Sequence, residues 1–180
     1  FYNPRSGSPA PPAIARPLRL AFFCLLPAAH PMPRLILDLP KAFAFSTEVQ
    51  IYLSHVNQGG HLDNAQLLAL VSEARVRFFN WLGYREFDVG DMNIVVADMM
   101  AQYKSEGFHG ESMRIEMVPA DISRYGFDLW FRMTEASKGR EVACGKSGIV
   151  FVGRSTGKPT PLPEPVRARF EEVAAVATAA

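Results

Sequence analysis

The sequence has few of the features that mark disulfide-rich, metal-binding, membrane-spanning or nucleic-acid-binding proteins. Only two of its 180 residues are cysteines, Cys24 and Cys144, and they match no metal-ligand spacing. Such sparse cysteine is typical of a protein kept reduced in the cytoplasm. The apolar run Leu18–Leu26 has about nine residues, whereas a membrane-spanning helix needs roughly 20. The formal net charge of +1 gives no field that would attract nucleic acid. We therefore expect a cytoplasmic protein that binds no metal, membrane or nucleic acid.

Residues 1–33 differ in composition from the rest of the chain. They are rich in proline, alanine and serine, and they contain Arg5, Arg16 and Arg19 but no acidic residue. This composition favours disorder. Arg16 and Arg19 beside the apolar run also fit a secretory signal. Because Met32 opens a more protein-like sequence, we interpret residues 1–33 as a disordered or non-native leader, 34–170 as one domain and 171–180 as a C-terminal tail.

The domain shows one long helical pattern among several strand patterns. Apolar residues alternate with period two in Phe43–Leu53, which predicts a strand. They recur every three or four positions from residue 64 to 82, which predicts a helix with Asp63 or Asn64 as its cap and Gly83 as its end. Further strands are predicted at Met92–Lys104, Ser112–Val118, Tyr125–Thr134 and Arg140–Val152, and a short final helix at Glu164–Ala177. One helix followed by a run of strands predicts an α+β fold, in which a curved antiparallel sheet wraps around one long central helix.

The residues around the start of the long helix carry a family pattern. Gly60–Ala65 reads GHLDNA, Glu73 and Arg75 follow within the helix, and Trp81–Gly83 reads WLG. Gly139–Ala143 and the proline-rich stretch after residue 155 follow in the expected order. Together these motifs, over residues 43–170, resemble the hotdog-fold acyl-CoA thioesterases, specifically the 4-hydroxybenzoyl-CoA thioesterase-like family. The family pattern is D-x-D-x-x-G-H-x-N-N-A followed by a helix with E-x-x-R.

The resemblance implies an enzyme that hydrolyses an acyl-CoA thioester to free acid and CoA. It implies an acyl-CoA substrate, no cofactor, and a homodimer or homotetramer with the site built between chains. At the two family Asp positions, however, this chain has His55 and Asn57. Two alternatives therefore stay open: a non-catalytic acyl-CoA-binding protein that has lost its carboxylate, and a hotdog hydratase or dehydratase.

Four residues are candidates for the chemistry. The leading base is Glu73, which we expect to be buried on the helix; one branch of the family uses a carboxylate there, and the alternative is a solvated pair with Arg77. Asp63 either caps the helix or activates water. Asn57 has no basic group but can orient water or a carbonyl through its amide. His61 can donate a hydrogen bond or act as a base.

Six further residues are candidates for binding the substrate. Gly59 and Gly60 lie just before the helix, where free backbone N–H groups can hold a developing oxyanion, although two glycines also make a tight turn. The resemblance places Ser147 and Gly148 near the pantetheine arm. Exposed cations near the entrance would bind the CoA phosphates, and we expect Arg154 and Lys158, with Lys104, to be either such groups or ordinary surface residues.

Overall fold

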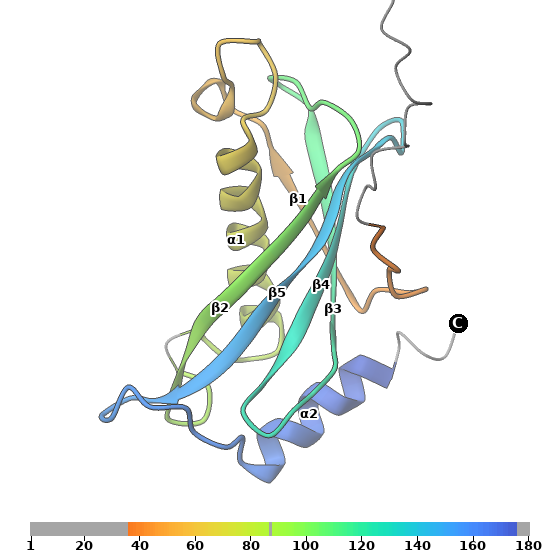
Figure 1. Ribbon diagram of the computed structural model, residues 1–180. Coiled ribbons are helices and arrows are strands. Elements are labelled where there is room, and N and C mark those ends of the chain that lie inside the picture. Colours follow the sequence, from red (N-terminus) through yellow and green to blue (C-terminus); the bar gives the residue numbers. More distant parts are fainter. Residues whose placement is uncertain (1–35, 87, 176–180) are drawn as a thin grey trace, which may run out of the picture. The chain divides into compact units, whose positions relative to one another are not determined.

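The computed structural model describes residues 36–86 and 88–175. This part of the chain contains five strands, two α-helices and one short 3-10 helix (Figure 1). In chain order they are β1 (Phe45–Gln50), η1 (Leu53–His55), α1 (Asn64–Trp81), β2 (Met92–Tyr103), β3 (Ser112–Ala120), β4 (Gly126–Glu135), β5 (Glu141–Gly153) and α2 (Glu164–Ala174). The predicted leader 1–33 and the last five residues of the predicted tail lie outside the described residues.

The strands form one antiparallel sheet in the order β1-β3-β4-β5-β2. β3, β4 and β5 follow one another along the chain and pair with their neighbours in sequence. β1 and β2 occupy the two edges and are joined through α1. The sheet is strongly twisted, and α1 lies against one of its faces (Figure 1). The observed fold is α+β, as the order of one helix and a run of strands predicted.

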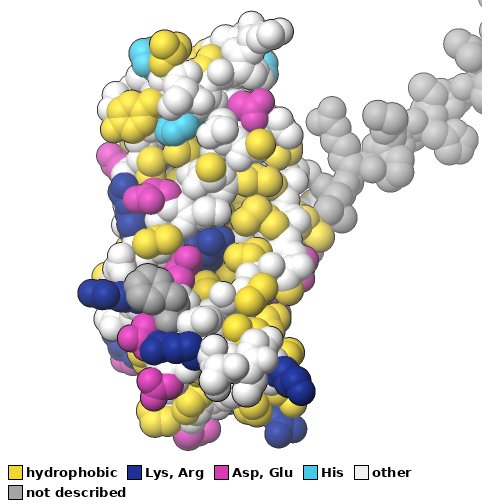
Figure 2. Space-filling model, turned by 90° about the vertical axis from the view of Figure 1, so that its left-hand side faces the viewer, with side chains coloured by type: hydrophobic (Ala, Val, Ile, Leu, Met, Phe, Trp, Pro, Cys, Tyr) yellow, Lys and Arg dark blue, Asp and Glu magenta, His cyan; other side chains and the backbone are white. Residues whose placement is uncertain are grey.

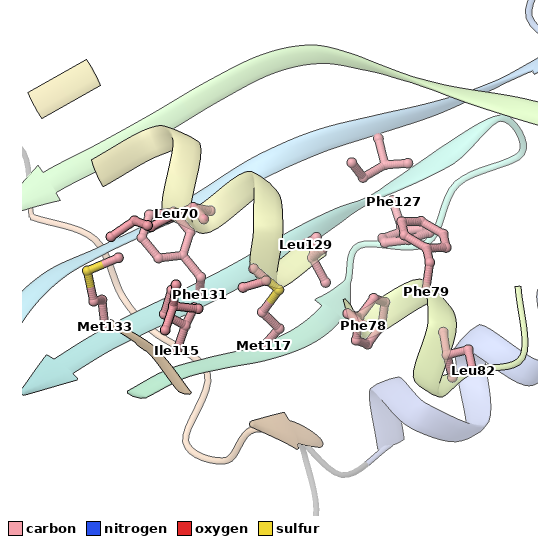
Figure 3. Close-up of a cluster of buried hydrophobic side chains, with 14 of the residues drawn as sticks. Leu70, Phe78, Phe79, Leu82, Ile115, Met117, Phe127, Leu129, Phe131 and Met133 are labelled. Carbon is pink, nitrogen blue, oxygen red and sulfur yellow. The ribbon is translucent and has the colours of Figure 1, made fainter. Parts of the chain in front are cut away.

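The hydrophobic core fills the space between α1 and the sheet. Alternate residues of β3 and β4 point towards α1, which contributes side chains three or four positions apart, so both predicted periodicities are confirmed. Burying each of these side chains stabilises the fold by roughly 1.5–3 kcal/mol. The residues at the centre of the core, each at most 4% exposed, are Leu70, Phe78, Phe79, Ile115, Met117, Phe127, Leu129, Phe131 and Met133 (Figure 3).

The helix α2 covers one end of this core with Val166, Phe170 and Val173, of which Phe170 is aromatic. Phe170 is fully buried, and its ring centroid lies 4.6 Å from that of Phe127, 5.9 Å from Phe151 and 6.0 Å from Phe79. Pro165 sits in the first turn of α2, where a missing N–H is harmless. Neither this helix nor any other in residues 36–86 and 88–175 is long and apolar enough to cross a membrane.

The helix α1 begins and ends at the residues that the sequence predicted. The Asp63 carboxylate accepts hydrogen bonds from the N–H groups of Ala65 and Gln66, so Asp63 is the N-cap. Gly83 follows the helix with φ +86°, the left-handed conformation that favours glycine. The helix contains 18 residues, about 27 Å. It is therefore a helix of moderate length rather than the long one that we expected.

Candidate active site

A pocket of about 350 Å³ opens at the N-terminal end of α1. Its walls come from the loop before α1, the first turn of α1 and the loop that follows β2. Figure 2 shows histidine side chains at this end of the molecule. Leu62, Leu67 and Val142 give the wall an apolar part, and most of the other lining residues carry polar side chains. The lining residues are Asn57, His61, Leu62, Asn64, Leu67, Tyr103, Lys104, Ser105, Glu106, Gly107 and Val142. Three of the predicted candidates, Asn57, His61 and Lys104, therefore meet in one pocket.

The loop before α1 is a tight turn held by its own backbone. Asn57 N–H donates to the His61 carbonyl oxygen at 3.0 Å, and Gly60 N–H donates to the Asn57 carbonyl oxygen at 3.0 Å. Gly60 has φ +82°, which explains why glycine stands there. At Gly59 a Cβ would lie 2.8 Å from Nε2 of His61, so glycine lets the imidazole pack on the backbone. Gly60 thus permits the turn, and Gly59 leaves space for the imidazole of His61.

The N–H groups of both glycines are already used inside this turn. Gly59 N–H donates to the side-chain oxygen of Asn57 at 2.9 Å, and Gly60 N–H donates as described above. The interpretation as a tight turn is therefore what the structure shows. In this conformation neither N–H points to a substrate carbonyl as a free donor.

The side chain of Asn57 determines which nitrogen of His61 carries the proton. Because Gly59 N–H donates to one side-chain atom of Asn57, that atom is the amide oxygen. The amide nitrogen then faces Nδ1 of His61 at 3.4 Å, and an amide nitrogen can only donate. Nδ1 is thus the acceptor, and the neutral imidazole carries its hydrogen on Nε2. Asn57 orients His61 so that a donor, not a base, points into the pocket.

The Nε2 atom of His61 faces a carboxylate that sequence reasoning missed. It lies 4.0 Å from Oε1 of Glu106, which belongs to the loop after β2. The side chains of His61 and Glu106 are 35% and 63% exposed, so solvent reaches the pair. In the sequence Glu106 is a lone acid in a polar turn, and no motif or spacing connects it to His61. The backbone bridge that pairs His61 with Phe108 holds the two loops side by side.

The carboxylates of Asp63 and Glu73 bind other groups outside the pocket. One oxygen of Asp63 accepts from Ala65 N–H at 2.8 Å and Gln66 N–H at 3.3 Å, so the carboxylate serves the helix terminus. Glu73 is exposed and pairs with Nε of Arg77 at 2.8 Å, one turn along the helix. The expected burial of Glu73 was wrong, because Leu70, Val71 and Ala74 occupy the buried face of α1 and Glu73 lies to one side of it. Neither carboxylate lines the pocket.

Comparison with known proteins decides the family. The model of the thioesterase-like superfamily matches residues 52–170. The chain belongs to this superfamily. Its class of reaction is thioester hydrolysis. Among curated proteins, none matches the chain significantly.

Solved structures that are similar to this thioesterase share its fold. A Thermus thermophilus thioesterase complexed with coenzyme A and Zn has a TM-score of 0.66 at 24% identity, with 75% of this chain and 97% of that chain covered. The 1,4-dihydroxy-2-naphthoyl-CoA thioesterase Slr0204 from Synechocystis has a TM-score of 0.65 at 18% identity, covering 72% and 96%. The DHNA-CoA thioesterase from Staphylococcus aureus has a TM-score of 0.67 at 19% identity, covering 74% and 92%. The sheet and α1 thus form a hotdog fold.

The remaining predicted binding residues of this thioesterase lie outside the pocket. Ser147 is 1% exposed on the face of β5 that α1 covers, opposite Leu129 of β4. Gly148 lies on the other face, where a Cβ would come within 2.6 Å of an Asp98 carboxylate oxygen. Within one chain, therefore, Ser147 packs in the core and Gly148 makes room for Asp98.

Arg154 and Lys158 lie at the far end of the sheet from the pocket. Gly153, just before Arg154, is opposite Met92 at the start of β2, whereas Tyr103 at the end of β2 lines the pocket. The twelve residues of β2 separate these ends by about 35 Å. Arg154 pairs with Asp88 at 2.6 Å. In the described part of the chain, no group of three or more histidine, cysteine, aspartate or glutamate side chains is arranged to hold a metal ion.

Proposed function

We propose that this thioesterase hydrolyses acyl-CoA thioesters to a free acid and CoA at the pocket beside the N-terminus of α1. The observation that carries the proposal is the combination, in one pocket, of an apolar wall with the hydrogen-bonded pair Asn57 and His61. An acyl group needs the apolar wall, and its thioester needs a few well-placed polar groups. The CoA in the Thermus structure and the CoA-derived names of the other relatives support CoA as the leaving group.

The pocket has one region for each part of such a substrate. Leu62, Leu67 and Val142 offer apolar surface to the acyl chain. The thioester carbonyl would lie near the first turn of α1, where the helix dipole favours the negative charge that develops on its oxygen. Lys104 lies at the pocket and is exposed, so it can attract a CoA phosphate.

We also propose that two chains pair through β2. In the described structure β2 pairs with β5 on one side only, and Met92 is its only buried residue. Most of its side chains are apolar, and Val95 and Tyr103 are 48% and 50% exposed. Hydrophobic side chains extend over much of the face that includes this edge (Figure 2). A long apolar edge strand of this kind invites pairing with another chain.

This pairing would give Arg154 and Lys158 a role. Two β2 strands joined in an antiparallel ladder place the start of one beside the end of the other. The loop after β5 of a second copy, with its two cations, would then lie towards the pocket of the first copy. About 35 Å separates these two cations from the pocket of their own chain. They therefore fit a phosphate subsite shared between two chains better than one within a single chain.

Thiol release from a panel of acetyl-, hexanoyl-, decanoyl- and benzoyl-CoA tests the proposal. We expect catalytic release from at least one of them, with a dimer or tetramer mass by light scattering. Binding of acyl-CoA without release would show a non-catalytic binder, and hydration of an enoyl-CoA would show the hydratase alternative. A monomer at working concentration would refute the pairing through β2.

A further inference from the structure

We propose that Glu106 is the carboxylate that activates the hydrolytic water, and that Arg140 is a positioning residue that fixes the loop carrying it. The proposal deepens the proposed thioesterase function and rests on it. Because position 57 carries no carboxylate, another group of the pocket has to accept the proton of water.

The gap between His61 and Glu106 fits one water molecule. Their facing atoms, Nε2 and Oε1, are 4.0 Å apart, too far for a direct hydrogen bond. A single oxygen atom can bridge two polar groups at such a separation. Because Asn57 leaves the hydrogen of neutral His61 on Nε2, His61 would donate to the water oxygen while the water donates to Glu106.

The hydrolysis needs no acid or base other than Glu106, with His61 holding the water. Glu106 takes a proton from water as the water oxygen forms a bond to the thioester carbonyl carbon, and the carbonyl π electrons move onto oxygen. The tetrahedral intermediate then collapses, the carbon–sulfur bond breaks with its electron pair on sulfur, and protonated Glu106 returns the proton to the CoA thiolate. The products are the free acid and CoA, and Glu106 is regenerated.

Three other carboxylates, two of them candidates from the sequence, are already engaged. Asp63 caps α1 and Glu73 pairs with Arg77. Glu111 accepts two hydrogen bonds from Arg140, at 2.8 and 2.9 Å. The Glu106 carboxylate, by contrast, makes no ion pair with a lysine or arginine among residues 36–86 and 88–175. It is the carboxylate of the pocket that is free to bind water.

Arg140 ties the Glu106 loop to the start of β5. Its guanidinium donates to both oxygens of Glu111, to Oγ of Ser105 at 3.0 Å and to the carbonyl oxygen of Glu106 itself. Glu111 in turn accepts from Phe108 N–H at 2.9 Å. These hydrogen bonds of Arg140 and Glu111 hold the loop on both sides of Glu106. They thereby set the distance of the Glu106 carboxylate from His61.

Substitutions in the full chain test both roles, with thiol release from hexanoyl-CoA and benzoyl-CoA as the assay. We expect Glu106→Gln to lower kcat by about 10²- to 10⁴-fold, the usual contribution of a general base, with KM changed less than about threefold. Formate should restore part of the activity of Glu106→Ala. Glu172→Gln, an exposed carboxylate on α2 paired with Arg169, is the matched control and should keep wild-type kcat.

For the positioning role, Arg140→Ala should lower kcat by roughly 10- to 100-fold, because a shift of about 1 Å in a reacting group has effects of this size. Formate should not rescue it. Arg140→Lys, which retains the charge and one donor, should recover part of kcat. This variant also keeps the test informative if Arg140→Ala fails to fold.

Glu106→Gln with at least a third of wild-type kcat, or Glu106→Ala without response to formate, would refute the role of Glu106. Arg140→Ala with a raised KM and unchanged kcat would refute the positioning role. In each of these cases the proposed thioesterase function stands. If the wild-type chain releases thiol from none of the tested thioesters, both proposals fail.

Discussion

Replacing Gly145 by alanine should separate β2 from β5, because this glycine has no room for a side chain. A Cβ at residue 145 would overlap the carbonyl oxygen of Met100 on β2 and lie 2.9 Å from its carbonyl carbon. It would also lie 2.8 Å from Cε1 of the buried Phe131 on β4. The atoms in the way on β2 belong to the backbone, so no side-chain rotation relieves the overlap.

The cost of this substitution follows from what has to move. The two strands must separate by about 1 Å, which breaks one or two ladder hydrogen bonds of roughly 1 kcal/mol each. Crowding against Phe131 adds about 1–3 kcal/mol, and the stiffer unfolded chain offsets about 0.4–1 kcal/mol. We expect a loss of roughly 2–4 kcal/mol in the free energy of unfolding. For a chain of this size the melting temperature should fall by about 4–16 °C.

Urea unfolding followed by circular dichroism, at one fixed protein concentration, measures this loss. Gly107→Ala is the matched control: a Cβ there would lie 2.9 Å from Cδ1 of Ile51, the flexible end of a side chain, so we expect a change below about 1 kcal/mol. A Gly145→Ala variant within 1 kcal/mol of the wild type would refute the tight approach of β2 and β5 at this position.

Three further predictions follow from single side chains. Glu73→Gln should lower kcat less than tenfold, since Glu73 lies outside the pocket; a fall as large as that of Glu106→Gln would restore the role that the resemblance implied. Burial raises the pKa of the Cys144 thiol, so in a Cys24→Ser variant Cys144 should react with Ellman's reagent far faster in denaturant than in buffer at pH 7, and equal rates would contradict its burial. Hydrogen bonds from the Ser137 hydroxyl and backbone lower the pKa of Glu135 below its ordinary value of 4.5. The stability that Glu135 contributes is therefore complete above pH 4.5 and lost as the pH falls through its folded pKa, so Ser137→Ala should flatten the pH dependence of unfolding in this range, and an unchanged acid limb would contradict it.

The elements were predictable because their signals are local. The alternation of Phe127, Leu129 and Phe131 identified β4 and its buried side without knowledge of its neighbours. Asp63 and Gly83 marked the ends of α1, because a cap and a left-handed glycine act within a few residues. The order of one helix and a run of strands was then enough for the fold class.

The site was predictable only on the side that carries a motif. The turn with Asn57 and His61 was found from GGH before the helix. Glu106 meets His61, and Arg140 meets the loop that carries Glu106, only through contacts between residues tens of positions apart. The exposure of Glu73 depends on how α1 is rotated against the sheet, and a helical pattern leaves residues at the edge of the apolar face undecided. The distance of Arg154 from the pocket depends on strand register, which no motif encoded.

The placement of β1 and β2 at opposite edges has a consequence for synthesis on the ribosome. β2 leaves the exit tunnel before β5, yet β5 is its partner, and the pairs run from Met92 with Gly153 to Tyr103 with Ala143. An apolar strand must therefore wait for some 40 to 60 further residues before it can be covered, and such non-local pairing is slow. During this interval nascent β2 is exposed to aggregation and to capture by chaperones.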